Sequence, residues 1–215
     1  MSLITLTDPR SPVSEAYRTL RTNLSFYSLD NPIRTLVVTS PASGEGKSTT
    51  VANLAVTMAQ SGRKTIMVDC DLRRPSLHEY FSLNPEPGLT NMLLSGAEKP
   101  PLQQTQVENL WLLASGAKPP NPADLLGSRK VDQAIAQLAE LADIILFDAP
   151  PVIAVTDAAV LGAKVDGVLL VLNAGKTRRD HAERAKEMLE KAHVRVVGAA
   201  LTNAPKDISI SGYYG

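Results

Sequence analysis

The sequence predicts an α/β fold built on an open, doubly wound sheet, mainly parallel, with helices on both faces. Short apolar runs alternate with amphipathic stretches along 215 residues, of which 44% are hydrophobic. The runs are continuous in Val, Ile and Leu, which is typical of strands that are covered on both faces. Repeated strand–helix–strand units favour right-handed parallel crossovers. The length fits a single domain over residues 1–215.

Each expected element follows from a local pattern. Strands are expected, in chain order, at 35–40, 64–71, 109–115, 143–150, 166–174 and 194–203. Amphipathic helices are expected chiefly at 47–61, 128–141 and 177–192. The proline-rich stretches 84–87, 100–101 and 119–122 predict loops with short helices in the middle of the chain. Ligands of such a sheet bind beyond the carboxyl ends of its strands, so polar residues at those ends are the candidate site.

Composition excludes several classes of protein. Lys and Arg together number 22, as do Asp and Glu, so the net charge of zero gives no overall attraction to nucleic acid. Cys70 is the single cysteine and the opening residues lack a signal-peptide layout, which favours a reducing cytoplasm. Since no apolar run reaches the roughly 18 residues of a membrane helix, membrane association would need a partner or a fused segment.

The segment SPASGEGKST, residues 40–49, predicts a phosphate loop. Its glycines let the backbone approach phosphate oxygens, and the following helix adds the positive end of its dipole. Lys47 would reach the terminal phosphates and Ser48 would bind Mg²⁺. Pro41 stands where a glycine usually opens the motif, and a plain strand-to-helix turn is the alternative. The predicted cofactor-binding residues here are Ser43, Gly44, Glu45, Gly46, Lys47, Ser48 and Thr49.

Three aspartates lie at the ends of two expected strands. Residues two apart in a strand point the same way, so Asp69 and Asp71 would both face the nucleotide while Cys70 points into the core. Asp148 follows four apolar residues, the usual layout for a carboxylate on the metal side of a nucleotide. A helix cap or turn former is the alternative for each aspartate taken singly.

Three of these motifs together resemble those of the bacterial tyrosine kinases (BY-kinases), which govern capsular and exopolysaccharide synthesis. The resemblance covers nearly the whole chain: residues 40–49 match the family's Walker A, TIMVDCDLRRP its Walker A′ and IILFDAPP its Walker B. It implies a P-loop NTPase fold of the MinD/ParA-like branch. It also implies an ATP-dependent protein-tyrosine kinase with ATP and Mg²⁺ as cofactors and protein tyrosines as substrates.

The expected N-terminal helix, 15–29, carries a fourth motif. Glu15, Arg18 and Arg21 in EAYRTLRTNL reproduce the family's E-x-x-R-x-x-R sequence. The resemblance implies that this helix packs against a neighbouring subunit in a homo-oligomeric ring. On the residues alone, such i,i+3 charges usually mark a solvated helix face, where a pair contributes about 0.2–0.5 kcal/mol.

The tail, residues 205–215, ends in SISGYYG. The resemblance implies that Tyr213 and Tyr214 are phosphoacceptors that enter a neighbour's active site. A chain end can reach another molecule, but two terminal tyrosines can also dock on the surface of their own chain. Family tails often carry more tyrosines than this one.

Site roles also follow from the resemblance. Lys47, Asp69, Asp71 and Asp148 are the predicted catalytic residues, with Asp69 or Asp71 as the base for the tyrosine hydroxyl. The predicted metal site comprises Ser48, Asp69 and Asp148. Arg73 and Arg74 would stabilise phosphate charge or form ion pairs, and Asn203 would hydrogen-bond adenine, although asparagine before a loop is more often a turn former.

Two other functions remain open. A MinD- or ParA-like switch ATPase shares the fold, but those proteins carry an early lysine in the phosphate loop where this chain has Ala42. A nucleotide-sensing module of a polysaccharide export complex is the third possibility. The kinase interpretation implies a membrane chain-length regulator as activating partner, fused or separate, and a location at the cytoplasmic face of the membrane.

Overall fold

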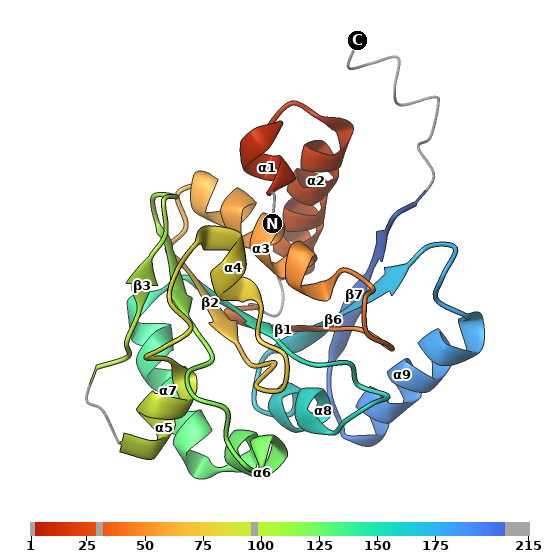
Figure 1. The fold of residues 1–215 in the computed structure, drawn as a ribbon. Helices are drawn as coiled ribbons and strands as arrows, with labels where there is room; N and C mark the ends of the chain where they lie inside the picture. The colour runs from red at the N-terminus through yellow and green to blue at the C-terminus, as the bar shows by residue number, and fades with distance from the viewer. Residues whose placement is uncertain (1–2, 29–31, 96–98, 205–215) are drawn as a thin grey trace.

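A seven-stranded sheet lies between two layers of helices in a computed structural model that describes residues 3–28, 32–95 and 99–204 (Figure 1). The strand order is β3-β4-β2-β5-β1-β6-β7. All neighbouring strands pair in parallel except β3 and β4, which are antiparallel. The strands are β1 (Thr35–Thr39), β2 (Thr65–Asp69), β3 (Gln103–Gln104), β4 (Leu110–Leu113), β5 (Ile144–Asp148), β6 (Gly167–Asn173) and β7 (Val196–Thr202).

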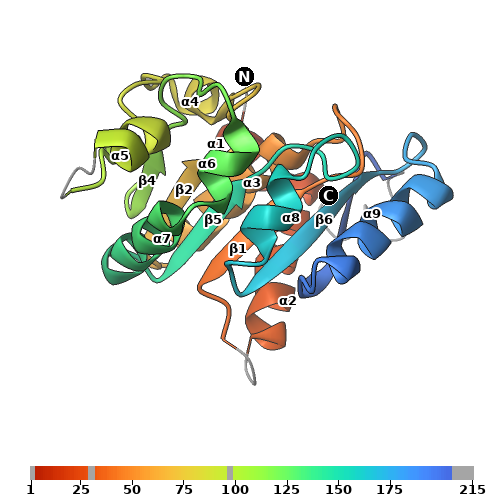
Figure 2. The ribbon, with the colours of Figure 1, turned by 90° about the horizontal axis from the view of Figure 1, so that it is seen from below.

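The helices divide between the two faces of the sheet (Figures 1 and 2). One face is covered by α1 (Ile4–Thr7), α2 (Pro12–Tyr27), α3 (Lys47–Gln60) and α4 (Leu77–Phe81). The other is covered by α5 (Leu89–Ser95), α6 (Pro122–Gly127), α7 (Arg129–Leu141), α8 (Asp157–Gly162) and α9 (Arg179–Lys191). This arrangement confirms the predicted doubly wound α/β fold.

The core consists of two apolar layers, one on each side of the sheet. Val37 of β1 packs into the layer beneath α5–α9, whereas its neighbours Leu36 and Val38 pack into the layer with α3. Burial on both faces explains why the strands read as continuous apolar runs, since each residue of a buried strand meets one layer or the other. Cys70 is also buried in the layer beneath α5–α9, which confirms the prediction that it points into the core.

Strand β3 and the start of helix α2 differ from the sequence-based expectation for identifiable reasons. Strand β3 was not predicted, because two residues, Gln103 and Gln104, are too few to show a period. Helix α2 begins at Pro12, earlier than the expected residue 15, because Ser11 caps it by accepting a 3.2 Å hydrogen bond from the Ser14 backbone N–H. Proline at the first helical position is compatible with this start, since no hydrogen-bond partner exists there for an N–H.

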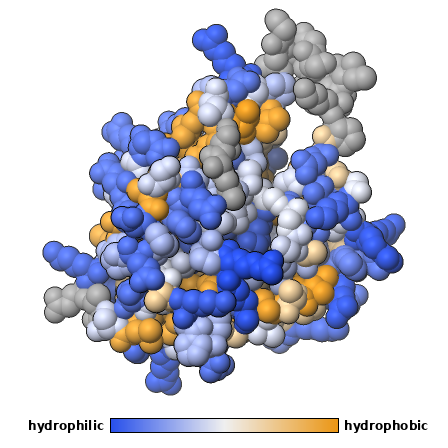
Figure 3. Space-filling model, viewed as in Figure 1, coloured by the Kyte–Doolittle hydropathy of each residue, from blue (hydrophilic) through white to orange (hydrophobic). Residues whose placement is uncertain are grey.

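The face of the molecule seen in Figure 3 is mainly hydrophilic, with hydrophobic side chains in small separate groups. Large exposed apolar side chains of the described residues include Phe26 on α2 and Leu201 on β7. Among the described helices, none has both the length and the apolar character that crossing a bilayer would take.

The sheet topology positions the candidate site. Strand β5 lies between β1 and β2, and in the register of β2 with β5 Asp69 stands directly beside Asp148. On the other side of β5, Val38 near the end of β1 pairs with Asp148. Neighbouring strands are about 4.8 Å apart, so the segments that follow these three strands converge at one edge of the sheet.

Candidate active site

The phosphate loop has the backbone that its glycines permit. Gly44 and Gly46 have φ angles of +76° and +92°, in the left-handed region that favours glycine, and Gly46 is the N-cap of α3. The base of the loop is fixed by two hydroxyls: Ser40 Oγ donates to the Ala42 carbonyl at 2.7 Å, and Thr39 Oγ1 donates to the Pro150 carbonyl at 2.7 Å. The free N–H groups at the start of a helix of this length bind anions readily.

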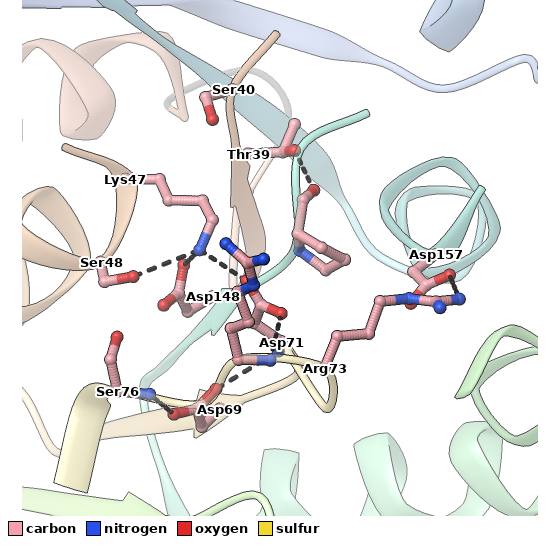
Figure 4. A network of polar contacts seen from close by, with 12 residues as sticks. Thr39, Ser40, Lys47, Ser48, Asp69, Asp71, Arg73, Ser76, Asp148 and Asp157 are labelled. Atoms are coloured by element: carbon pink, nitrogen blue, oxygen red, sulfur yellow. Dashed lines mark hydrogen bonds and ion pairs between the residues drawn. The ribbon is translucent and has the colours of Figure 1, made fainter. Parts of the chain in front are cut away.

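Lys47 lies at the centre of the polar network in Figure 4. Its Nζ is 2.9 Å from Asp71 Oδ2, 3.4 Å from Asp148 Oδ1 and 3.3 Å from Ser48 Oγ. Burial by itself would lower the pKa of Lys47, but the nearby carboxylates of Asp148 and Asp71 outweigh burial and raise it. Lys47 therefore carries a positive charge at neutral pH, at the point where the phosphate loop meets α3.

Asp148 ends β5 and its side chain is 0% exposed. Burial raises the pKa of Asp148 above its ordinary value, while Lys47 and Ser48 oppose that shift. Its second oxygen, Oδ2, is buried without a hydrogen-bond partner among the described residues. A buried carboxylate oxygen left without a donor is costly, so this atom has capacity for a further ligand.

The residues around Asp148 fit a magnesium ion. The Ser48 hydroxyl and the Asp148 carboxylate are hard oxygen donors next to Lys47. No group of three or more His, Cys, Asp or Glu side chains suited to a metal occurs in the described parts of the chain. Mg²⁺ does not require such a group, because it commonly binds one or two carboxylates together with substrate phosphates and water.

Asp69 and Asp71 have different surroundings, although their spacing predicts that both face the nucleotide. Asp69 Oδ2 accepts 2.9 Å hydrogen bonds from the backbone N–H groups of Ser76 and Leu77, and Oδ1 accepts one from Asp71 N at 3.3 Å. Burial and the adjacent Asp148 raise the pKa of Asp69 to about 8. Asp71 instead lines the pocket beside the phosphate loop.

The difference has a simple cause. Strand β2 ends at Asp69, so the alternation of side chains in a strand does not extend to Asp71. The chain turns after Asp69, and the Asp69 carboxylate holds that turn by binding the backbone that leads into α4. Asp71 lies in the turn itself, where its Oδ1 accepts a 3.0 Å hydrogen bond from Arg74 N and its Oδ2 faces Lys47.

A pocket of about 640 Å³ adjoins this network. It is lined by the phosphate loop and the start of α3, and by an apolar wall from the segment after β5. Arg73, Arg74, Ser76 and Tyr80 complete the lining. The wall consists of Pro150, Pro151, Ala154 and Val155. The residues from the phosphate loop and α3 are Ser43, Gly44, Gly46, Lys47, Ser48 and Thr49, and Asp71 also belongs to the lining.

Arg73 and Arg74 differ in their contacts. Arg73 makes a bidentate ion pair with Asp157, with Nε 3.0 Å from Oδ2 and Nη2 3.1 Å from Oδ1 (Figure 4). Asp157 is fully buried at the start of α8, whereas the Arg73 side chain is 40% exposed. This ion pair ties the turn after β2 to the segment after β5. The side chain of Arg74 forms no ion pair with a described residue.

Two predicted cofactor-binding residues lie outside the pocket lining. The Glu45 side chain is 2% exposed and bonded to Thr177, so only its backbone is available to phosphates. Asn203 directly follows β7, is exposed and has a φ of +52°. A left-handed asparagine is typical of a turn, so its role toward adenine stays a prediction.

The remaining predicted residues fall on α2 and the tail. Glu15 and Arg18 contact each other within α2, and Arg18 Nη2 also donates to the Pro9 carbonyl at 2.8 Å. Arg21 Nη1 donates to the Thr57 carbonyl of α3 at 2.8 Å. These contacts are all within one chain, so the oligomerisation role stays a prediction. Tyr213 and Tyr214 lie outside the described residues.

Sequence reasoning missed several residues of the pocket. Tyr80 of α4 reaches the start of α3, where its hydroxyl lies 2.7 Å from Thr49 Oγ1. Nothing in the sequence marks Tyr80, because α4 enters the site only through the turn that Asp69 holds. The two prolines after Asp148, Pro150 and Pro151, were a weak sequence signal for the apolar wall. Proline has no backbone N–H that would lack a hydrogen-bond partner in an apolar lining.

These features define the class of protein: a phosphate loop after the first strand, followed by convergent carboxylates at the ends of two neighbouring strands, belongs to a P-loop nucleotide-binding protein. A family model described as "ParA: NUBPL iron-transfer P-loop NTPase" matches residues 32–203. The curated protein YwqD of Bacillus subtilis (strain 168), named a tyrosine-protein kinase, is 41% identical over 100% of this chain and 91% of its own.

The chain belongs to the bacterial tyrosine kinase family. The crystal structure of the chimerical protein CapA2B2 has a TM-score of 0.90 and 37% identity, covering 95% of this chain and 90% of that one. The tyrosine-protein kinase wzc of Salmonella typhi is 32% identical over 94% of this chain, which corresponds to only 28% of wzc. Some relatives are therefore much longer proteins that contain a region similar to this chain.

Proposed function

We propose that residues 1–215 act as one ATP-dependent protein-tyrosine kinase domain that requires Mg²⁺. The observation that carries this proposal is that Asp71 lines the same 640 Å³ pocket as the phosphate loop and the apolar residues that follow β5. The lining of this pocket contains cationic side chains that suit a triphosphate and apolar side chains that suit a phenol ring. The name of YwqD, a tyrosine-protein kinase, supports the same activity.

The phosphate loop would hold the nucleotide through its backbone N–H groups, with Lys47 on the terminal phosphates. Ser48 and Asp148 would hold Mg²⁺, whose charge offsets that of the phosphates and of the transition state. The unpartnered Oδ2 of Asp148 supports this role, because a buried carboxylate oxygen needs either a donor or a cation. In this proposal Asp69 organises the turn, so Ser48 and Asp148 are the members of the predicted metal site that hold the ion.

Asp71 is the proposed base. The acceptor hydroxyl has an ordinary pKa of about 10, so its proton must leave as the new bond forms. The tyrosine oxygen would bond to the γ-phosphorus, the bond from that phosphorus to the bridging oxygen of ADP would break, and the proton would pass to the Asp71 carboxylate. Asp71 fits this role better than Asp69, because Asp71 lines the pocket, whereas Asp69 is fully buried and is not part of the lining.

The acceptors would be Tyr213 and Tyr214, reached in trans within a homo-oligomeric ring. The ring contact would be made by Glu15, Arg18 and Arg21 of α2, whose charges are partly exposed. A membrane chain-length regulator, fused or separate, would activate the kinase at the cytoplasmic face of the membrane and link it to capsular or exopolysaccharide synthesis. The greater length of wzc is compatible with the fused arrangement.

Labelled ATP tests the activity directly. Purified protein is incubated with Mg²⁺ and ATP, with and without the cytoplasmic tail of a candidate activator, and phosphorylated residues are mapped by mass spectrometry. Phosphate on Tyr213 or Tyr214 that is lost in Lys47→Met supports the kinase. Phosphate released only to water would instead establish a switch ATPase, and nucleotide binding without either product would favour a sensing module.

A further inference from the structure

A buried glutamate joins the phosphate loop to a second loop of the protein, residues 174–178, between β6 and α9. Glu45 Oε1 accepts a 2.8 Å hydrogen bond from Thr177 Oγ1, and that hydroxyl in turn accepts one from Asn173 N at 2.8 Å. Glu45 is only 2% exposed. Because the hydroxyl both accepts and donates, the position of Thr177 is fixed relative to the phosphate loop.

A second set of contacts holds the same two loops together. Thr202 Oγ1, at the end of β7, donates to the Glu45 carbonyl at 2.8 Å, and Ala174 N donates to the Thr202 carbonyl at 2.8 Å. Thr202 also packs so closely on Gly46 that a Cβ at Gly46 would lie 3.2 Å from its methyl carbon. Residues 174–178 are therefore anchored against the phosphate loop at two separate points.

This anchoring places a lysine beside the phosphate loop. A Cβ built on Gly44 would lie 3.2 Å from Lys176 Nζ, so the ammonium sits directly over the backbone of Gly44. Gly44 lines the pocket beside Lys47. Unlike Lys47, which is paired with Asp71 and Asp148, Lys176 forms no ion pair with any residue in the described ranges.

Glu45 also has unused capacity. Its second carboxylate oxygen, Oε2, is buried and has no hydrogen-bond partner in the described part of the protein. Burial of a carboxylate that has a hydrogen bond to one oxygen only lowers the stability of the fold. A functional role of Glu45 would explain why this residue is found in the phosphate loop. Positioning the adjacent loop, and with it a cation, supplies such a role.

We propose that Lys176 is a second phosphate-binding lysine of the nucleotide site, and that the Glu45–Thr177 hydrogen bond positions it. The inference rests on nucleotide binding, which is part of the proposed function, but not on tyrosine phosphorylation. Lys176 would add a charge-assisted contact to the phosphate chain next to Gly44. The side chains of Glu45 and Thr177 have a positioning role: they act through Lys176 and do not touch the nucleotide.

The test is equilibrium binding of a fluorescent ADP analogue with Mg²⁺ at low and high salt. Lys176→Met should weaken binding about tenfold at low salt, as expected for loss of one charge-assisted contact, and less at high salt. Lys176→Arg should retain most of the affinity. Arg178→Met is the matched control, because Arg178 lies two residues away, is 73% exposed and, within the described ranges, pairs with Asp180 alone, at 2.9 Å. Affinity within twofold of wild type in Lys176→Met overturns the proposal.

The positioning role has its own measurement. Thr177→Val should weaken binding about threefold in the wild-type background and have no further effect in Lys176→Met, whereas Thr177→Ser should restore affinity. Equal effects of Thr177→Val in both backgrounds would overturn the positioning role. If wild type binds the nucleotide but phosphorylates no tyrosine, the kinase fails while Lys176 stands. If wild type binds no nucleotide, both proposals fail.

Discussion

The ammonium nitrogen of Lys47 lies 2.9 Å from Oδ2 of Asp71. This contact joins the residue proposed to bind the terminal phosphates to the residue proposed to accept the proton of the tyrosine. Nucleotide phosphates would compete with Asp71 for the same ammonium. Binding of the nucleotide would then release the Asp71 carboxylate for the acceptor, so the base becomes available only when nucleotide phosphates occupy Lys47.

The ammonium group of Lys47, which contacts Asp71 and Asp148, should stabilise the fold in the absence of nucleotide. Lys47→Met leaves Asp71 and the fully buried Asp148 without it, and breaking a buried ion pair in this way costs about 3 kcal/mol. Urea unfolding should show that loss in the free energy of unfolding. Asp148→Asn in the Lys47→Met background should recover part of it, and equal stability of Lys47→Met and wild type would contradict the prediction.

The two neighbouring aspartates should separate catalysis from folding. Asp71→Asn should lower kcat for tyrosine phosphorylation by about a hundredfold or more, because the proton acceptor is lost. Its affinity for Mg²⁺–ADP should not fall, because Asp71 competes with phosphates for Lys47. Asp69→Asn should chiefly lower thermal stability, since Asp69 holds the turn before α4. A larger loss of kcat at equal stability in Asp69→Asn would identify Asp69 as the base.

Stability of the nucleotide-free protein should fall with rising pH because of Asp69. Its folded pKa of about 8 lies above the unfolded value of about 3.9, so the folded state binds the proton more tightly. This contribution is fully present below about pH 4 and is lost as pH rises to about 8, by at most about 1.4 kcal/mol per pH unit. Urea unfolding between pH 5 and pH 8 without Mg²⁺ gives the free energy of unfolding at each pH. This free energy should depend less steeply on pH in Asp69→Asn than in wild type. Identical slopes would contradict this assignment.

The ion pair of Arg73 with Asp157 should matter more for stability than its partly exposed arginine suggests. Arg73→Ala would leave a fully buried carboxylate without its donors, at a cost of about 2 kcal/mol. Thermal unfolding should show this loss, and Asp157→Asn in the same background should reduce it. Arg74→Ala is the matched control and should leave stability nearly unchanged. Equal effects of the two arginine variants would rule out a special role for the pair.

Assembly should depend on the charged residues of α2. Replacing Glu15, Arg18 and Arg21 together by Ala should lower the molar mass measured by light scattering from that of the ring to that of a monomer. The matched control is Arg179→Ala with Glu183→Ala, which removes an exposed pair on α9 and should not change the mass. An unchanged mass with reduced stability in the α2 variant would mean that these charges serve only their own chain, as the Arg21–Thr57 hydrogen bond does.

Much of the fold was predictable because buried parallel strands leave a strong pattern. The six longer strands and the helices α3, α7 and α9 follow from apolar runs and helical periodicity. The two-residue strand β3 and the short helices α4 and α8 could not be predicted in the same way, because their places depend on contacts distant in the chain. For α4 the contact is the hydrogen bonding of Asp69 to Ser76 and Leu77.

The sequence alone determined the phosphate loop, because glycine spacing, Lys47 and Ser48 act through local backbone geometry that the neighbouring residues specify. It also indicated the family, because three motifs that follow one another along the chain match those of the bacterial tyrosine kinases. Only the tertiary structure decided which aspartate faces the pocket, since strand alternation ends at Asp69 and the turn after it sets the direction of Asp71. It also brought Lys176 to Gly44, although 132 residues separate them in the chain, because β6 and β7 end beside the phosphate loop.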